Sequence, residues 1–315
     1  MIIDTHVHVF DKRMGISQQT DREYFHFAGT SVEWLLTSMD YAGVDKASLI
    51  SYTAEDISCC LPEGIGPVEF GSAMNREYVI EAVKKYPDRF YWFADHVDPR
   101  KDDYMAKAGE NIDEGATGLK ILSSFTGLFP DDPRLMQVYE LCRNRHVPII
   151  LDFSFWYINR LERMPLKIEN KDYRDFLGHV AKVAESFPDV NFQIAHYGSP
   201  ENNKYLVESG DLAAYAPFIE LMKNYNNLFT DLAALWFPKN EDYPFHCVSR
   251  FIAQLIRAIG ADKVMFGTDW PYFCNGITLT YRQGLRLIRE ADSLKHEEIE
   301  LILGRNALRF LGKRT

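Results

Sequence analysis

The sequence predicts a (β/α)8 barrel, and three observations carry this prediction. Short runs of β-branched and aromatic residues alternate with longer helical patterns in eight successive units. Proline marks the junctions in "KKYPDRFYWFA" and "ESFPDVNFQIA", where it disfavours further helix at the residue before it and a strand follows. No glycine-rich phosphate turn follows the first strand. The barrel is therefore preferred to an open doubly wound sheet, which remains the alternative.

The elements follow in order along the chain. We expect strands at residues 1–9, 45–52, 89–97, 116–122, 147–153, 190–196, 227–232 and 263–268. We expect helices at residues 32–43, 72–86, 103–114, 134–145, 172–187, 213–226, 247–260, 279–291 and 296–311. Long loops at 10–31, 52–71 and 154–171 follow the first, second and fifth strands. In a barrel such loops lie at the C-terminal face, where they can cover a site.

Composition limits the classes of partner. With 315 residues, 46% of them hydrophobic, the chain can bury one large core, and we expect a single barrel domain over 1–315. A net charge of −10 without a long basic run makes nucleic acid and anionic membranes poor partners. The N-terminus lacks a secretory signal pattern, and its apolar run is too short to span a bilayer. Five cysteines without disulfide or zinc spacing indicate reduced thiols in the cytoplasm.

Two histidines stand in the apolar run that opens the chain, "MIIDTHVHVF". Because side chains alternate across a strand, His6 and His8 share one face and would both point into a barrel. Burying two neighbouring imidazoles is costly unless each has a partner, and a metal ion is one such partner. Histidines that only form hydrogen bonds in the core are the alternative interpretation.

Ionisable residues close other strands as well. The residues are His96, Lys120, Asp152, His196 and Asp269, which end the third, fourth, fifth, sixth and eighth strands. A single buried polar group of this kind is often structural. Five of them would converge at the C-terminal face of a barrel, where active sites lie, so the pattern predicts a site there.

Aromatic residues follow the fifth, seventh and eighth strands, and they could line a pocket for a planar or ring-shaped substrate. The candidates are Trp156, Tyr157, Trp236, Trp270 and Tyr272, with Phe237 beside them. The alternative is that each packs a loop onto the barrel rim.

The segments "DTHVHVF", "FQIAHYG", "DKVMFGTDWP" and "ILGRNALRFLG" occur in this order along the chain. Together they resemble the amidohydrolase superfamily, in the branch of aminocarboxymuconate semialdehyde decarboxylase. The resemblance implies a distorted barrel with a divalent metal, zinc first and manganese next, acting on a small molecule, commonly as a homodimer. It also implies that His6 and His8 are metal ligands and that Asp269 is a ligand or proton acceptor. His196 would polarise the substrate or move a proton.

The chain departs from this family at the fifth strand. The decarboxylase pattern ends that strand in a histidine ligand, whereas here Asp152 ends "VPIILD". A carboxylate can replace the histidine as a ligand, or the metal is weak or absent, as in some lactonase-like relatives. Lys120 also has two interpretations. In some branches such a lysine is carboxylated and bridges two metals, but here we expect a charge partner for the substrate or a structural ion pair.

Three functions compete at this point. The first is hydrolysis of a small ester, lactone or amide by a metal-activated water, with Asp269 accepting its proton and His196 stabilising the oxyanion. The second is non-oxidative, metal-dependent decarboxylation of an aromatic or unsaturated carboxylic acid. The third is a barrel that binds a ligand without catalysis. We rank hydrolysis just above decarboxylation.

Overall fold

A computed structural model of the chain describes residues 1–10, 29–51, 76–94, 98–153, 173–198, 200, 203–235, 237, 241–271, 279–291 and 293–313. Eight parallel strands form one sheet in the order β1 to β8. The strands are β1 (Ile3–Val7), β2 (Lys46–Ile50), β3 (Phe90–Ala94), β4 (Gly118–Leu122), β5 (Ile149–Asp152), β6 (Phe192–Ile194), β7 (Leu228–Asp231) and β8 (Val264–Met265). The predicted strands are all present, and each is shorter than expected.

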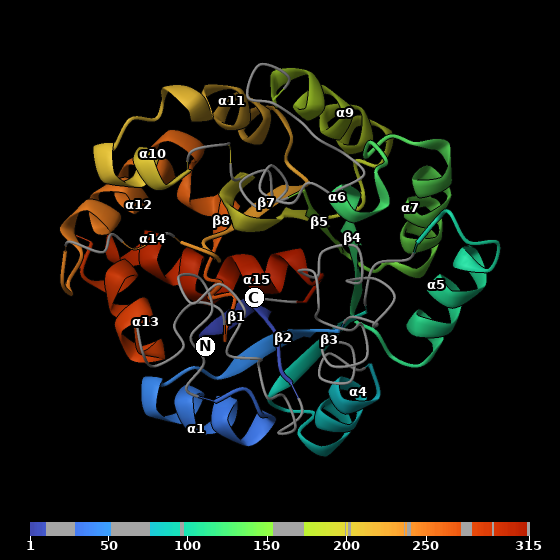
Figure 1. Cartoon of the computed structure of the whole chain (residues 1–315), viewed down its shortest axis with the longest axis horizontal. Helices are drawn as coiled ribbons and strands as arrows, with labels where there is room; N and C mark the ends of the chain where they lie inside the picture. The colour runs from blue at the N-terminus through green and yellow to red at the C-terminus, as the bar shows by residue number, and fades with distance from the viewer. Residues whose placement is uncertain are drawn as a thin grey trace, which may run out of the picture.

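Most of the helices form a ring outside the strands, and the last one, α15 (Asn306–Phe310), lies inside this ring (Figure 1). The helices before it are α1 (Val32–Ala42), α4 (Arg76–Lys85), α5 (Tyr104–Asp113), α6 (Ser123–Thr126), α7 (Pro133–Arg145), α9 (Tyr173–Ser186), α10 (Asn203–Ser209), α11 (Ala216–Asn224), α12 (His246–Ile259), α13 (Tyr281–Arg289) and α14 (His296–Glu300). Short turns of helix are η3 (Ala195–Gly198), η4 (Ala213–Tyr215), η5 (Ala261–Lys263) and the π-helical η6 (Leu301–Arg305). Helices α6 and α10 were not expected from the sequence.

The barrel closes between β1 and the segment around β8. Thr5 N–H donates to the Phe266 carbonyl at 3.0 Å, and His8 N–H donates to the Trp270 carbonyl at 2.7 Å. Asp269 N–H donates in turn to the His6 carbonyl at 2.9 Å. These bonds confirm the barrel over the open sheet, whose edge strands would stay unpaired. They also bring the predicted site residues of the first and eighth strands together.

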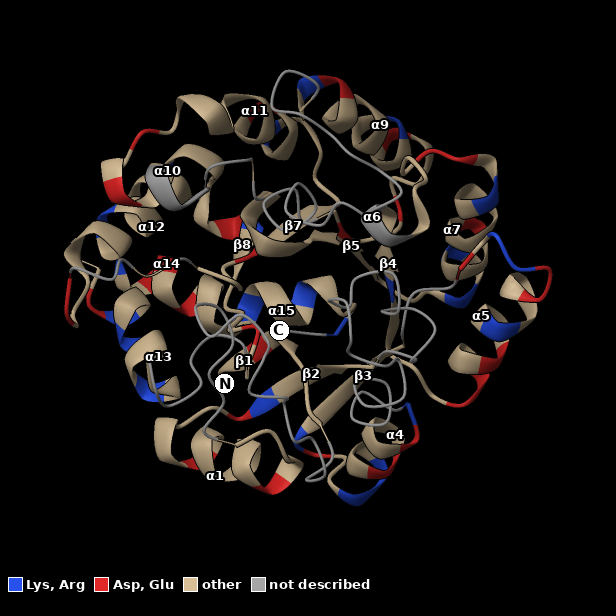
Figure 2. Cartoon of the chain, viewed as in Figure 1, with Lys and Arg blue, Asp and Glu red and all other residues tan. Residues whose placement is uncertain are grey.

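Local sequence explains where several helices begin and end. Ser31 caps α1 by accepting from Trp34 N–H at 3.4 Å, and Gly43, in the left-handed region, ends the helix. Asp132 caps α7 by accepting from Arg134 N–H at 3.0 Å. Thr280 and Gln283 form a reciprocal capping box at the start of α13. Lys, Arg, Asp and Glu residues are distributed over the outer helices (Figure 2). The apolar residues of the same helices pack into the core against the sheet.

Helix α15 covers the N-terminal end of the barrel. Its Phe310 stacks on Phe93 with ring centroids 5.9 Å apart and meets Phe229 edge-on at 5.9 Å. The buried side-chain amide of Asn306 donates to the carbonyls of Ala261 and Val264 at 2.7 Å each. The closing segment of the chain therefore fills the bottom of the barrel, which leaves the opposite end for chemistry.

Close packing between β3 and β4 gives a testable consequence. A Cβ on Gly118 would lie 2.4 Å from Phe93 Cε1 and 2.5 Å from the Pro148 carbonyl oxygen. We expect Gly118→Ala to lower the free energy of unfolding by about 1–3 kcal/mol, because neither neighbour can move freely. Gly109, on α5, has open space at this position, so Gly109→Ala should raise the free energy by about 0.5–1 kcal/mol. Chemical denaturation measures both, and equal stabilities would contradict the packing.

Among the described residues, none of the helices has both the length and the apolar character needed to cross a membrane. The long loops 10–31, 52–71 and 154–171 fall largely outside the described residues.

Candidate active site

Strand β1 and the residue that follows it place two buried imidazoles, His6 and His8, at the C-terminal end of the barrel. His6 is fully buried and His8 is 3% exposed. Their rings meet edge-on, with centroids 5.4 Å apart. Val7, the one residue between them, packs into the apolar core instead, as the alternation of side chains along a strand predicts. The sequence therefore places the two imidazoles close together at this end of the barrel.

His6 is held at both ring nitrogens. Its Nδ1 lies 3.0 Å from Asp231 Oδ2, and its Nε2 lies 2.9 Å from Lys120 Nζ. A carboxylate can only accept here, so Nδ1 carries the proton and Nε2 presents its lone pair to the site. This is how metal-ligating histidines are commonly oriented.

Asp231 accepts hydrogen bonds from the His6 ring and from the His196 backbone, and it was not among the site residues predicted from the sequence. The carboxylate is fully buried. Oδ2 accepts from His6 and from Gln193 Nε2 at 2.5 Å, while Oδ1 accepts from His196 N–H at 2.8 Å and Ala233 N–H at 3.0 Å. The residue closes the apolar strand β7, as other site residues close theirs. Applying the same strand-end pattern to "NLFTD" would have found it.

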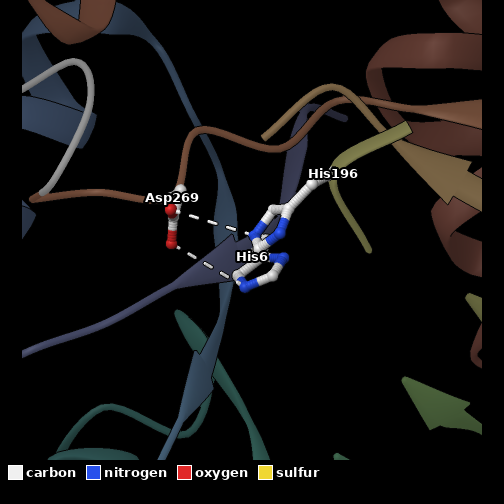
Figure 3. Close-up of side chains that lie close together, drawn as sticks. All are labelled: His6, His196 and Asp269. Atoms are coloured by element: carbon white, nitrogen blue, oxygen red, sulfur yellow. Dashed lines mark ion pairs between the residues drawn. The ribbon is translucent and has the colours of Figure 1, made fainter. Parts of the chain in front are cut away.

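Asp269 reaches the site from the segment after β8. Its Oδ1 lies 3.3 Å from His8 Nε2 and 3.8 Å from His6 Nε2, and its Oδ2 lies 3.9 Å from His196 Nε2. Figure 3 shows the carboxylate facing the two imidazoles of His6 and His196, which stack with centroids 4.8 Å apart. Three side chains from three parts of the barrel therefore converge.

Two of these residues adopt an uncommon backbone conformation. Asp269 has φ of 53° and His196 has φ of 57°, both in the left-handed region. Such conformations in non-glycine residues cost of order 1 kcal/mol or more and gather at functional sites. Here they turn the chain at the ends of β6 and β8 so that the side chains point inward.

Burial controls the charge of the site. Burial raises the pKa of Asp269 to about 7, and the nearby charges of His196 and Lys120 oppose this increase. Burial lowers the pKa of His6 and of His8 well below the usual range, and the positive charge of Lys120 adds to the effect. Both imidazoles are therefore neutral, which is the form that accepts a proton or binds a metal.

Lys120 and Asp152 form a buried ion pair on the inner face of neighbouring strands. In the register of β4 and β5, Lys120 aligns with Ile150 and Leu122 aligns with Asp152. Lys120 Nζ lies 2.9 Å from Asp152 Oδ2, with side chains 1% and 4% exposed. Asp152 Oδ1 lies 3.8 Å from His196 Nδ1. The pair therefore connects β4, β5 and β6 within the site.

A further buried carboxylate, Asp4, lies two residues before His6 in β1. It accepts from His6 N–H and Thr268 N–H at 3.1 Å each, from Thr268 Oγ1 at 2.6 Å, and from the Tyr281 hydroxyl. Burial raises the pKa of Asp4 to about 7, and these hydrogen bonds oppose the increase. Asp4 thereby fixes the segment that leads into Asp269 against β1.

The donor set fits a divalent cation. Ligand bonds of 2.0–2.2 Å at tetrahedral angles place two zinc ligands about 3.3–3.6 Å apart. The separations of Asp269 Oδ1 from His8 Nε2 and His6 Nε2, 3.3 Å and 3.8 Å, are close to this value. Candidate ligand atoms of His6, His196 and Asp269 also lie within 4.8 Å of one another. Asp152, expected from the sequence as a further ligand, has its Oδ2 at 2.9 Å from Lys120 Nζ, and its role as a metal ligand stays a prediction.

The structure brings together most of the predicted site residues. His6, His8, Lys120, Asp152, His196 and Asp269 all lie in this cluster. Trp270 is 1% exposed and packs in the core that surrounds the barrel. The other residues predicted for the site fall outside the described residues, and they are Trp156, Tyr157, Trp236, Tyr272 and His96.

Solved structures of similar fold include both hydrolases and decarboxylases. A probable 2-pyrone-4,6-dicarboxylic acid hydrolase from Acinetobacter baumannii is 18% identical, with a TM-score of 0.62 over 99% of each chain. A 2,6-dihydroxybenzoate decarboxylase from Rhizobium is 18% identical, with a TM-score of 0.62 over 99% of this chain and 98% of that one. A Burkholderia multivorans amidohydrolase with bound zinc is 14% identical, with a TM-score of 0.66 over 100% of both.

None of the curated proteins compared with this sequence matches it. The sequence profile described as "Amidohydrolase" matches residues 3–313, which is nearly the whole chain. The match includes His6, His8, the Lys120–Asp152 pair, His196 and Asp269. The chain therefore belongs to the amidohydrolase family.

Proposed function

We propose that this protein is a metal-dependent hydrolase of a small ester, lactone or amide. The observation that carries the proposal is the position of the Asp269 carboxylate, with one oxygen beside His8 and the other facing His196 in a buried site. A carboxylate in this position can take a proton from an attacking water and return it to a leaving group. The similarity of fold to a pyrone dicarboxylic acid hydrolase supports the same reaction class.

His6, His8 and Asp269 would hold the divalent ion, zinc first and manganese next. When bound, such an ion polarises a carbonyl and lowers the pKa of a water molecule toward neutrality. Asp231 keeps the His6 lone pair turned toward it through the bond at Nδ1. The zinc in the Burkholderia multivorans structure of similar fold supports the choice of ion.

The chain's own groups have separate tasks in this reaction. Asp269 accepts the proton of the attacking water and then donates it to the leaving oxygen or nitrogen. His196, at the end of β6, donates a hydrogen bond to the oxygen on which negative charge develops. The left-handed backbone at both residues holds their side chains toward the same point before the substrate arrives.

Decarboxylation of an aromatic or unsaturated carboxylic acid is the second candidate. The buried ammonium of Lys120 favours it, because a substrate carboxylate is a natural partner for such a group. The dihydroxybenzoate decarboxylase of similar fold supports this alternative.

A substrate panel separates the two reactions. The purified protein, loaded with zinc or with manganese, is incubated with lactones, aryl esters and anilides while acid release is followed with a pH indicator. In parallel, hydroxybenzoates are incubated and carbon dioxide is measured. We expect acid release from at least one lactone or ester and none from buffer controls. Carbon dioxide release from hydroxybenzoates without any hydrolysis would overturn the proposal in favour of decarboxylation.

Three further expectations remain predictions. They are one barrel domain over 1–315, a homodimer and a cytoplasmic location. Trp156, Tyr157, Trp236, Trp270 and Tyr272, with Lys120, also remain proposed contacts for the substrate.

A further inference from the structure

We propose that Lys120 is a built-in cation that competes with the divalent metal for His6, and that Asp152 holds it in place. The inference rests on the proposed function for the position of the metal. It deepens that proposal by naming the residues that set how tightly the metal binds.

The competition arises because His6 has one lone pair to offer. Nδ1 is bonded to Asp231 at 3.0 Å and carries the proton, which leaves Nε2 as the acceptor. Lys120 Nζ lies 2.9 Å from that Nε2, which is a hydrogen-bond distance. A ring nitrogen whose lone pair accepts an ammonium N–H cannot at the same time bind a metal. An ion that uses His6 must therefore displace Lys120.

Charge strengthens the competition. The Lys120 side chain is 1% exposed, and lysine is almost never buried so fully unless it is paired. Asp152 Oδ2, at 2.9 Å, supplies the pairing and keeps the ammonium next to His6. A divalent ion entering beside this ammonium would meet a like charge in a buried site, where the repulsion is poorly screened. The positive charge of Lys120, which Asp152 holds beside His6, therefore opposes the binding of a divalent metal.

The same contact argues against a metal-bridging role for Lys120. A carboxylated lysine carries a negative charge and would be repelled by Asp152 at this distance. An ammonium is attracted by it. The two roles predict opposite results when Lys120 is removed, because a bridging ligand strengthens metal binding and a competing cation weakens it.

The test measures zinc affinity without any substrate. Metal-free protein is prepared by dialysis against a chelator, and zinc is then titrated in competition with a chromogenic chelator. Lys120→Met should bind zinc about 10-fold or more tightly than the parent, the scale seen when groups around metal ligands change. Lys182→Met is the matched control, because Lys182 pairs with Asp131 at 3.1 Å on the surface and is 64% exposed. Its affinity should equal that of the parent.

A second variant separates the release of His6 from a change in net charge. Lys120→Met leaves Asp152 buried without its partner, which is destabilising and adds negative charge to the site. The double variant K120M/D152N removes one positive and one negative charge, so the net charge of the site stays the same. Replacing a buried ion pair as a unit is often neutral for stability. We expect this variant also to bind zinc about 10-fold more tightly than the parent, since His6 Nε2 has lost its competitor.

Two outcomes overturn the inference. One is a K120M/D152N protein that melts cooperatively yet binds zinc no more tightly than the parent. The other is weaker zinc binding in both variants, which would assign Lys120 to the metal as a ligand. A failure of the proposed function would be seen separately, in the activity of the zinc-loaded proteins. Tighter zinc binding in the variants together with no hydrolysis by any zinc-loaded protein would refute hydrolysis and keep the competition.

Discussion

Replacing Asp269 by asparagine is expected to lower kcat by about 10²- to 10⁴-fold, the usual contribution of a positioned proton acceptor. Asparagine has nearly the same shape as aspartate but cannot take a proton from water. Its NH₂ group would also replace one of the two oxygens, either Oδ1 beside His8 Nε2 or Oδ2 facing His196 Nε2. The measurement is kcat on the best ester or lactone of the panel, at saturating zinc, so that a loss of metal affinity does not enter the comparison.

Asp113→Asn is the control for this substitution. Asp113 ends α5 and pairs with Arg145 at 2.8 Å on the surface, with 60% of its side chain exposed. The control should keep the parent kcat and melting temperature. A positioned proton acceptor contributes more than about 10-fold to kcat. If the kcat of Asp269→Asn stays within about 10-fold of the parent value, another group accepts the proton and the proposed role of Asp269 is wrong.

The fold was predictable because its signals are local and repeated. Each strand is a short apolar run and each long helix has a regular pattern, so eight units could be read in order. The predicted element boundaries were wrong where the chain leaves regular structure at the site. The predicted strand 263–268 contains only Val264–Met265 as β8, since the residues after it bond to β1 and turn at Asp269. Helix α6, with four residues, is too short to show a period.

The site was predictable in part for the same reason. Ionisable residues that end apolar strands stand out in a sequence, and His196 and Asp269 were found in this way, while His6 was found with His8 in the opening apolar run. Asp4 and Tyr281 were not, because their contact joins residues 277 positions apart and exists only once the barrel has closed. The Lys120–Asp152 pair shows a different limit. Both residues were identified, but the sequence does not tell whether Asp152 binds a metal or the lysine.

Replacing Asp231 by asparagine is expected to have the second large effect, on both stability and metal binding. Both carboxylate oxygens accept two hydrogen bonds each from buried or backbone donors. Whichever way the asparagine amide turns, its NH₂ group faces two donors. We expect the free energy of unfolding to fall by about 3 kcal/mol, because buried donors lose the charged acceptor that they now share. Zinc affinity should fall by about 10- to 100-fold, because His6 is no longer held with Nε2 toward the site.

Denaturation and chelator competition measure the two effects on the same preparations. Asp242→Asn, at an exposed position before α12, is the control and should change neither. The two readouts divide the possible roles of Asp231. A protein that is destabilised but binds zinc as the parent does would limit Asp231 to structural support of β6 and β7. Loss of zinc affinity in Asp231→Asn, at a temperature where the variant is fully folded, would identify the carboxylate as the group that orients His6. The effect on zinc would then run opposite to that of K120M/D152N, because Asp231 presents the His6 lone pair and Lys120 occupies it.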